Sequence, residues 1–552
     1  MNETSTGPAG TEAAQMKADH RQNLTGQSRI AANTVAVWAG ELVLMVSGFI
    51  LPRLIDSQIG QERLGIWDFG WSMVSYLGLV QCGVASSVSR YVAKYRTAGD
   101  LGGLNCAASS VTCVFLVMAA IVVLLALTLV LAVPATLSSR LGEHVAEAQQ
   151  VTFFLGLAIA LQVGMTAFGG VITGCHCWGL YNAIEAGGNI LALIGMVCVL
   201  FLGGGLAGLA LMVLCGEGAA WTARFVAAHR VCPGLRVRFS LARRSMAWSM
   251  MAFGGKTFVP VVAQVILSQT VSVLIMCYMG PAALAMFSRP SALVRQMRTF
   301  VLKFSLVVSP TASSFQALNQ GKELRDLLVT TTRYAAFIAI PIATLLAVFA
   351  DPILRLWMGP RYEQGTVLLV LALGNLPAVI LLPVLSILQG MNLHGRPGLA
   401  YLAASIVAIA LGVLAVGLLG WGLLGAALAV TVPILVASVV YVPAYACRHL
   451  GLRLGRYLRE SLLAPVLCAL PFTAALLACR LTLADSPLVS LACGLLAGGA
   501  MLAPLYWRYA MPLSIKERLI RWFSRPSAEP LPPAAASNPE APAVVADDSA
   551  KV

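Results

Sequence analysis

The chain has 552 residues, of which 59% are hydrophobic and only 11% are charged, and its formal net charge is +14. A mean hydropathy of +0.83 excludes a soluble globular domain of this length and predicts an integral membrane protein with many spans. The positive charge does not indicate a nucleic-acid partner, because the cytoplasmic loops of membrane proteins concentrate lysine and arginine. Membrane lipids are therefore the expected surroundings of most of the chain.

Fourteen apolar runs are long enough to cross a bilayer as helices, so the predicted fold class is all-α integral membrane. A polar segment, 1–29, precedes them and is expected to be a disordered cytoplasmic N-terminus. A tail, 508–552, follows them; it begins basic, becomes rich in proline and alanine, and is expected to be a disordered cytoplasmic tail. The predicted spans are 30–51, 64–89, 104–133, 149–173, 184–203, 205–227, 248–277, 284–312, 334–350, 365–389, 398–419, 422–446, 461–479 and 488–507.

The distribution of basic residues predicts the orientation of these spans. With the N-terminus inside, the cytoplasmic segments hold 26 lysines and arginines, whereas the outer loops hold 6. This excess satisfies the positive-inside rule. Both termini are therefore expected in the cytoplasm.

Short matches at nearly constant separation indicate an internal repeat. The segment GQERLGIW at Gly60–Trp67 resembles GPAALAMF at Gly280–Phe287, 220 residues later. Two further matches, GLAGL with GLLGA and GLR with a second GLR, are each 217 residues apart. Spans 1–6 and 7–12 are therefore predicted to form two six-helix bundles related by an axis along the membrane normal, with spans 13 and 14 added. The expected divisions are a first lobe at 30–229, a basic cytoplasmic linker at 230–247, a second lobe at 248–447 and the last two spans at 448–507.

Span 8 carries an unusual number of cations for an apolar segment. On a helix through FSRPSALVRQMRTFVLKFSLVVSP (Phe287–Pro310), four basic side chains lie on roughly one half of the surface. Each cation at bilayer depth costs about 3 kcal/mol or more, so such a helix should face water, protein or an anionic ligand. We therefore predict that these side chains line a cavity that receives an anion. The candidate residues are Arg289, Arg295, Arg298 and Lys303, with Lys256 of span 7.

The corresponding positions of the first copy favour a binding role for these cations over a structural one. At 220 residues earlier, the chain has only Phe69, Ser75, Gly78 and Gly83, so the same helix is expected to fold there without charge. For Arg289, which lies early in a span that runs from outside to inside, the alternative is a side chain that extends to the outer interface.

Acidic residues in the spans have two possible roles. Glu41 and Glu217 either couple transport to protons or sodium ions or act as buried partners of the cations. Asp68 is a third candidate for these roles, although Asp68 and Glu185 lie close to a membrane interface, where solvation is the simpler explanation.

No metal site, cofactor or catalytic residue is predicted. The segment Cys175–Cys177, which reads CHC, resembles a metal-binding motif, but its ligands are too closely spaced for a complete site and no second pair follows. Trp71, Tyr76 and Gln81 are candidates for contacts with sugar rings, with core or interface packing as the alternative.

The arrangement of spans and two sequence segments resemble one protein family. These segments are RYVAKYRTAGD at Arg90–Asp100, after span 2, and GLLGAALAV at Gly422–Val430, which opens span 12. They are similar to the polysaccharide-biosynthesis flippases of the multidrug/oligosaccharidyl-lipid/polysaccharide exporter superfamily. The resemblance covers about 29–508. The related lipid II flippases also have fourteen spans, but their arginine-rich first span is not found here.

The resemblance implies a flippase for a lipid-linked oligosaccharide in a bacterial plasma (inner) membrane. Such a protein moves a polyprenyl-diphosphate-linked oligosaccharide from the cytoplasmic to the outer leaflet by alternating access, for cell-surface polysaccharides such as exopolysaccharide or O-antigen. A cationic central cavity holds the diphosphate, and the last two spans add a groove for the lipid tail. Glycan polymerases and glycosyltransferases of the same pathway are the implied partners. A diphosphate fits the bidentate geometry of Arg295 and Arg298.

Three other functions are weighed against this one. A multidrug or organic-cation exporter of the same superfamily should have carboxylates at its centre and usually stops at twelve spans. A membrane glycan polymerase or ligase generally needs a large outer loop for its acceptor, and the outer loops here are short. A passive scaffold in a glycan-assembly complex is the third alternative, which only a transport measurement separates from a flippase.

Overall fold

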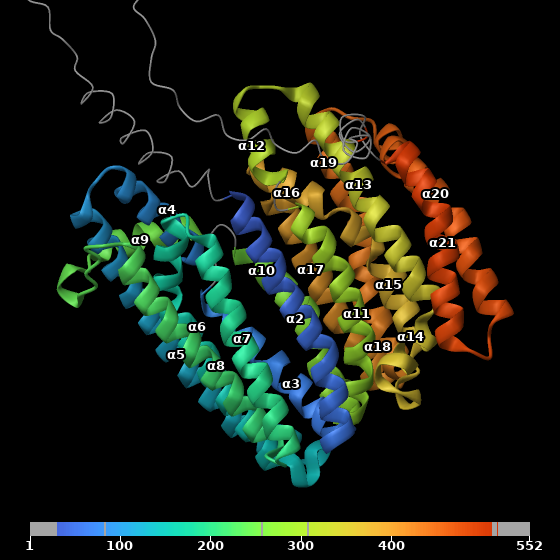
Figure 1. Cartoon of the computed structure of the whole chain (residues 1–552), viewed down its shortest axis with the longest axis horizontal. Coiled ribbons are helices and arrows are strands. Elements are labelled where there is room, and N and C mark those ends of the chain that lie inside the picture. The colour runs from blue at the N-terminus through green and yellow to red at the C-terminus, as the bar shows by residue number, and fades with distance from the viewer. Residues whose placement is uncertain (1–29, 82–83, 255–257, 306–307, 511–515, 517–552) are drawn as a thin grey trace, which may run out of the picture. The chain divides into compact units, whose positions relative to one another are not determined.

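The computed structural model of the chain is helical throughout its regular elements (Figure 1). The predicted segment 1–29, most of the predicted tail 508–552 and the candidate site residue Lys256 lie outside the described residues. For Glu41 only the backbone, within a helix, is described. The described residues are 30–81, 84–254, 258–305, 308–510 and 516.

The chain divides into two compact units, Met1–Leu502 and Ala503–Val552, and α21 (Pro487–Tyr509) ends in the second. Within the first unit, the predicted first lobe is a layer of packed helices. Figure 1 shows α5, α6 and α8 side by side, and their contacts bury alanine, valine and leucine side chains between them. α4 and α3 pack on α6, and α2 packs on α7. These helices are α2 (Ile30–Ile59), α3 (Gln61–Leu77), α4 (Val84–Thr97), α5 (Leu101–Leu141), α6 (Val145–Gly174), α7 (Trp178–Phe201) and α8 (Gly205–Val231).

The predicted second lobe is a second group of packed helices. α10 packs on α17, α13 on α15 and α20, and α18 on α15 and α17. The helices are α10 (Phe258–Met279), α11 (Pro281–Ser305), α12 (Val308–Ala317), α13 (Gly321–Val348), α14 (Ala350–Met358), α15 (Gly365–Ile380), α16 (Leu382–Gly390), α17 (Gly395–Gly412), α18 (Gly422–Val436), α19 (Val442–Leu450) and α20 (Leu454–Thr482).

Helix α9 (Arg244–Gly254) forms the start of predicted span 7, yet it packs against α4 and α5 of the first lobe. The next helix of the same span, α10, packs against the second lobe and α3. The linker is also attached to α5 through its short turn η4 (Phe239–Leu241). The chain between the lobes is therefore held on the first lobe up to the end of α9.

Ten ranges among the described residues are long and apolar enough to cross a membrane, so the protein is a multi-pass membrane protein. One of these ranges, Leu101–Gly174, contains both α5 and α6. Predicted spans 1, 2 and 8 are not among them. Span 2 is divided between α3 and α4, and span 8 carries its cations and is divided between α11 and α12. The full count of fourteen stays a prediction.

Two equivalent glycines join helix pairs in the two copies of the repeat. Gly60 lies between α2 and α3, and Gly280 lies between α10 and α11, with φ angles of 94° and 88°. A side chain is rarely tolerated at such angles, so glycine permits the chain to reverse at a single residue. The helices that follow meet at these ends: a Cβ on Gly65 of α3 would lie 1.9 Å from the carbonyl oxygen of Pro281. The repeat found in the sequence thus marks the place where α3 and α11 touch.

Candidate functional site

The candidate site is built on α11, the helix that carries the predicted anion-binding cations. Proline at its first position, Pro281, has no N–H to leave unpaired and favours helical φ, so the helix begins sharply after Gly280. α11 packs against α3 of the first lobe and against α10, α13, α15 and α16 of the second. Its cations are therefore placed along the boundary between the lobes.

Arg289 is buried, with 3% of its surface exposed, and forms an ion pair with Asp68 of α3. Its guanidinium group also lies over the ring of Trp357, 6.0 Å from the ring centroid. The Trp357 indole N–H donates to the carbonyl of Phe49 in α2, at 2.7 Å. Arg289 is thus enclosed between α3, α11 and α14 and does not extend to an interface, which was the alternative for this residue. Asp68 is a charge partner.

Further bonds join the lobes around this ion pair. The hydroxyl of Tyr362 donates to Asp56 at 2.6 Å, and Arg53 donates to the Trp357 carbonyl. Arg140 of α5 donates to the carbonyl of Cys277 at 3.1 Å. These bonds gather at the end of the helices that holds the Gly60 and Gly280 turns, which the distribution of basic residues predicts to be the outer end.

Tyr76 extends this joined region deeper along the helices. Its hydroxyl is 2.6 Å from the hydroxyl of Thr270, which links α3 to α10. Tyr76 lies about 22 Å along α3 from its start, and Arg295 lies about 21 Å along α11 from its start. Arg295 is therefore at the level of the Tyr76–Thr270 bond, and Arg298 lies one turn beyond it.

Arg295 and Arg298 differ from Arg289 in having no protein partner. Neither guanidinium group makes a hydrogen bond or ion pair with any residue that the structure describes. Arg295 is exposed although protein surrounds much of it, and Asp68 and Arg289 are within electrostatic range. Arg298 is partly exposed and lies near Tyr401 of α17. Residues three apart on a helix are neighbours, so the two groups can bind one ligand together.

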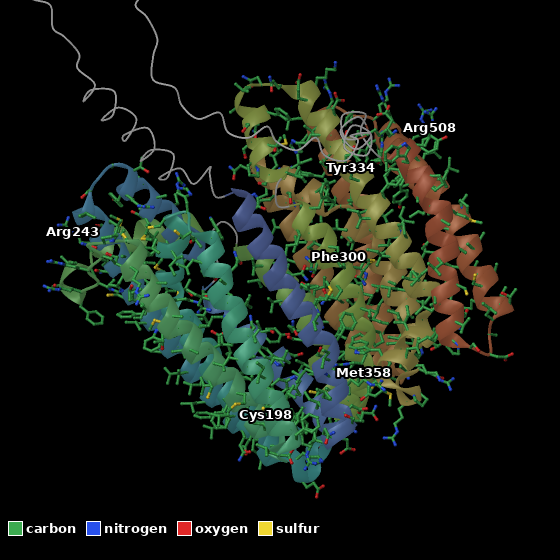
Figure 2. All side chains as sticks on the ribbon, in the orientation of Figure 1. Cys198, Arg243, Phe300, Tyr334, Met358 and Arg508 are labelled. Carbon is green, nitrogen blue, oxygen red and sulfur yellow. The ribbon has the colours of Figure 1, made fainter. Side chains whose placement is uncertain are left out.

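The last cation of α11, Lys303, lies in its final turn and is partly buried with an interaction of its own. Phe300, labelled in Figure 2, is the exposed residue of α11 between Arg298 and Lys303, and its neighbour Val301 is buried. The structure thus divides the predicted cations into a paired one near the joined end and two unpaired ones beyond it.

The acidic residues of the first lobe form a separate cluster around Arg224. This arginine is buried with 3% exposed, pairs with Glu185 and lies 3.7 Å from Glu217. Gln162 donates to the other oxygen of Glu217 at 3.5 Å. Arg224 is not among the residues that the sequence singled out, although its spacing of seven residues from Glu217 places both on one helix face and could have suggested the pair.

The three candidate sugar contacts have different environments. Tyr76 is engaged with Thr270, and the amide oxygen of Gln81 accepts from Thr166 at 3.1 Å. Trp71 is partly exposed, and its ring packs edge-on against Trp67 with centroids 6.1 Å apart. Trp71 is therefore the one of the three with an open aromatic face.

The predicted CHC segment forms no metal centre with its neighbours in the described part of the chain, where no group of three or more His, Cys, Asp or Glu could hold a metal. Cys175 is buried at the end of α6, and His176 has a φ of 59°. Its residues form a turn between α6 and α7.

Comparison with known protein families finds a match to part of the chain. Residues 105–367 match the profile of the family described as "Polysaccharide biosynthesis protein". Through this segment, which is just under half of the chain, the protein is similar to the polysaccharide biosynthesis family. No curated protein sequence matches the chain.

Solved structures show which fold the chain has. The lipid II flippase MurJ, in an inward closed conformation, aligns with a TM-score of 0.67 and 15% identity, over 87% of this chain and all of that one (100%). An inward-facing multidrug resistance MATE family transporter of the MOP superfamily aligns with a TM-score of 0.64 and 15% identity, over 75% of this chain and 94% of that one. A MOP superfamily transporter from Pyrococcus furiosus Vc1 gives a TM-score of 0.59 and 14% identity, over 78% and 97%. The chain therefore has the fold of these three transporters.

Proposed function

We propose that the protein is a flippase that moves a polyprenyl-diphosphate-linked oligosaccharide from the cytoplasmic to the outer leaflet of a bacterial inner membrane. Two findings support the class of function: residues 105–367 match the profile of a polysaccharide biosynthesis family, and the chain has the fold of MOP superfamily transporters. The assignment of the substrate rests on the pair of unpartnered arginines on α11. Both termini are placed in the cytoplasm by the distribution of basic residues.

The energetic argument starts from the cost of these charges. A guanidinium group at membrane depth is costly unless water or an anion compensates it, and Asp68 compensates only Arg289. Arg295 and Arg298 can compensate a ligand that carries two negative charges next to each other. A diphosphate is such a ligand, and the planar arginine fork binds phosphate oxygens bidentately. The lipid tail can meanwhile stay in the surrounding hydrocarbon.

The position of these arginines supports loading from the cytoplasm. The lobes are joined from the Gly60 and Gly280 turns to the level of Tyr76 and Thr270. Arg295 lies at the far limit of this joined region, and Arg298 lies beyond it. The joined end of the helices is the predicted outer end. A ligand therefore reaches both arginines from the opposite, basic end, which faces the cytoplasm. Trp71, on the same helix as Tyr76, supplies an aromatic face on which a sugar ring can stack.

Reconstitution into liposomes with a fluorescent polyprenyl-diphosphate oligosaccharide tests this proposal. The variant Arg295→Gln/Arg298→Gln is expected to lose transfer between leaflets by at least tenfold while keeping its melting temperature. Arg361→Gln, which removes one exposed arginine from the turn after α14, serves as the control and should transfer normally. Wild-type transfer of an organic cation without transfer of the lipid-linked glycan would overturn the proposal.

A further inference from the structure

The linker between the lobes, here called the linker strap (Cys232–Arg244), is fastened along the start of α5 by side chains. The side-chain amide of Asn105 bonds the strap twice: its N–H donates to the carbonyl of Gly234 at 3.1 Å, and its oxygen accepts from the Arg236 N–H at 2.8 Å. This pair of bonds replaces the backbone partners that the extended strap lacks. Leu235, between them, is buried.

Two serines continue the attachment along the same helix. Ser109 accepts from the N–H of Arg238 at 3.1 Å, and Ser110 accepts from the N–H of Arg243 at 2.8 Å. The attachment from Asn105 to Ser110 covers about 7.5 Å of α5. Since span 3 is predicted to enter the membrane at 104, the strap lies at the depth where lipid headgroups meet the helix. It does not project freely into the cytoplasm.

The strap presents concentrated positive charge at this depth. Its four arginine side chains are exposed and form no ion pair with any described residue. The sequence contains no aspartate or glutamate between Glu217 and Glu323, so acidic neighbours along the chain are absent as well. Figure 2 shows Arg243 directed away from the helices. The four residues are Arg236, Arg238, Arg243 and Arg244.

Large apolar side chains are exposed next to these arginines. Phe239 is 76% exposed in the strap, and Trp248 is 70% exposed in the adjoining helix α9. Such exposure is unfavourable in water but stabilising where aromatic rings enter the interfacial region of a bilayer. A soluble anion would use the arginines and leave these rings unpartnered. A phospholipid surface engages both.

We infer that the linker strap is a docking surface for anionic phospholipid headgroups of the cytoplasmic leaflet. The arginines bind the phosphates, and Phe239 and Trp248 insert beside the upper part of the acyl chains. Each arginine near an anionic surface contributes about fivefold in lipid binding. The inference does not depend on the proposed cargo, because the strap is attached to α5 and lies apart from Arg295 and Arg298 on α11.

Native mass spectrometry of the full-length protein, titrated in detergent with phosphatidylglycerol or phosphatidylcholine, tests the inference. The wild type is expected to retain phosphatidylglycerol at least tenfold better than phosphatidylcholine and to gain melting temperature with it. Arg236→Gln/Arg238→Gln/Arg243→Gln/Arg244→Gln should lose this preference. A matched control removes four exposed arginines at the corresponding end of the second lobe and should keep it. The control residues, all changed to Gln, are Arg448, Arg453, Arg456 and Arg459.

Three further measurements separate lipid binding by the linker strap from a folding defect and from binding of a soluble anion. Replacement of the four strap arginines by lysine keeps the charge and should keep the preference, which excludes a folding defect as its cause. Phe239→Ser/Trp248→Ser should weaken the binding of both lipids while phosphatidylglycerol stays preferred. Inorganic phosphate at equal concentration should give no stabilisation. Equal losses in the strap and control variants, or full stabilisation by phosphate alone, would overturn the inference.

Discussion

Arg289 and Asp68 are 221 residues apart and form an ion pair, and the matched segments Gly60–Trp67 and Gly280–Phe287 that open α3 and α11 are offset by 220 residues. The two partners therefore occupy almost equivalent positions of α11 and α3. A contact between equivalent positions of two copies lies close to the axis that relates them. If the two lobes part at this end, as the proposed alternating access requires, this ion pair must separate.

Removal of one partner of this pair should destabilise the protein strongly. Asp68→Asn leaves the Arg289 guanidinium group buried without a counter-charge, and such a change costs about 3–5 kcal/mol. We expect a large fall in melting temperature, measured by intrinsic fluorescence of the purified protein. The double variant Asp68→Asn/Arg289→Gln should recover part of the loss, since no unpaired charge remains. If Asp68→Asn has the same melting temperature as Arg361→Gln, water already solvates the ion pair.

Transfer of the cargo should depend on the planar guanidinium geometry of the two unpartnered arginines as well as on their charge. Arg295→Lys keeps the positive charge but cannot bind two phosphate oxygens in one plane. We expect transfer of the lipid-linked oligosaccharide to fall by about tenfold, intermediate between wild type and Arg295→Gln, in the liposome assay. The same change at Arg361 is the matched control. If the Arg295→Lys variant transfers cargo as fast as the wild type, the site supplies only a diffuse positive field.

The sequence predicted the helical membrane class and the helix that carries the cations, because apolar length and charge are local features. Which cation is free and which is paired depends on contacts between distant segments. Asp68 looked like a solvated residue near an interface, and its partner is on another lobe. Arg224 did not stand out in the sequence, because its burial against Glu185 and Glu217 comes from the packing of α7 on α8.

The Tyr362–Asp56 bond should be insensitive to pH over the physiological range. Burial, with the bond to Asp56 as a second cause, raises the pKa of Tyr362 well above its ordinary value near 10. Because the folded pKa is raised, the stabilisation is fully present below the unfolded pKa and is lost only as pH rises above about 10.

We therefore expect the difference in melting temperature between wild type and Tyr362→Phe to be constant from about pH 6 to pH 9 and to shrink above about pH 10. The substitution leaves the Asp56 carboxylate without its donor, which costs about 1–3 kcal/mol. Thermal unfolding across this pH range is the measurement. A difference that changes near neutral pH would mean that another group controls this contact.

The close approach of α3 to α11 at Gly65 should control how tightly the outer ends are joined. A methyl group there would meet the backbone oxygen of Pro281 at 1.9 Å, so one of the two helices must move. Gly65→Ala is expected to cost about 1–3 kcal/mol and to favour the state in which these ends are apart. Gly78→Ala is the matched control, since nothing lies within 4 Å of its Cβ position.

A crosslink across the same contact measures this shift directly. Gln61 donates to the carbonyl of Ala282 at 3.5 Å, so cysteines at these two positions, in a background without the native cysteines, should be joined by a short bifunctional thiol reagent. Gly65→Ala should lower the crosslink yield severalfold and Gly78→Ala should not. An unchanged yield with Gly65→Ala would show that the helices absorb the methyl group locally, and the outer contact would then not depend on close packing at this glycine.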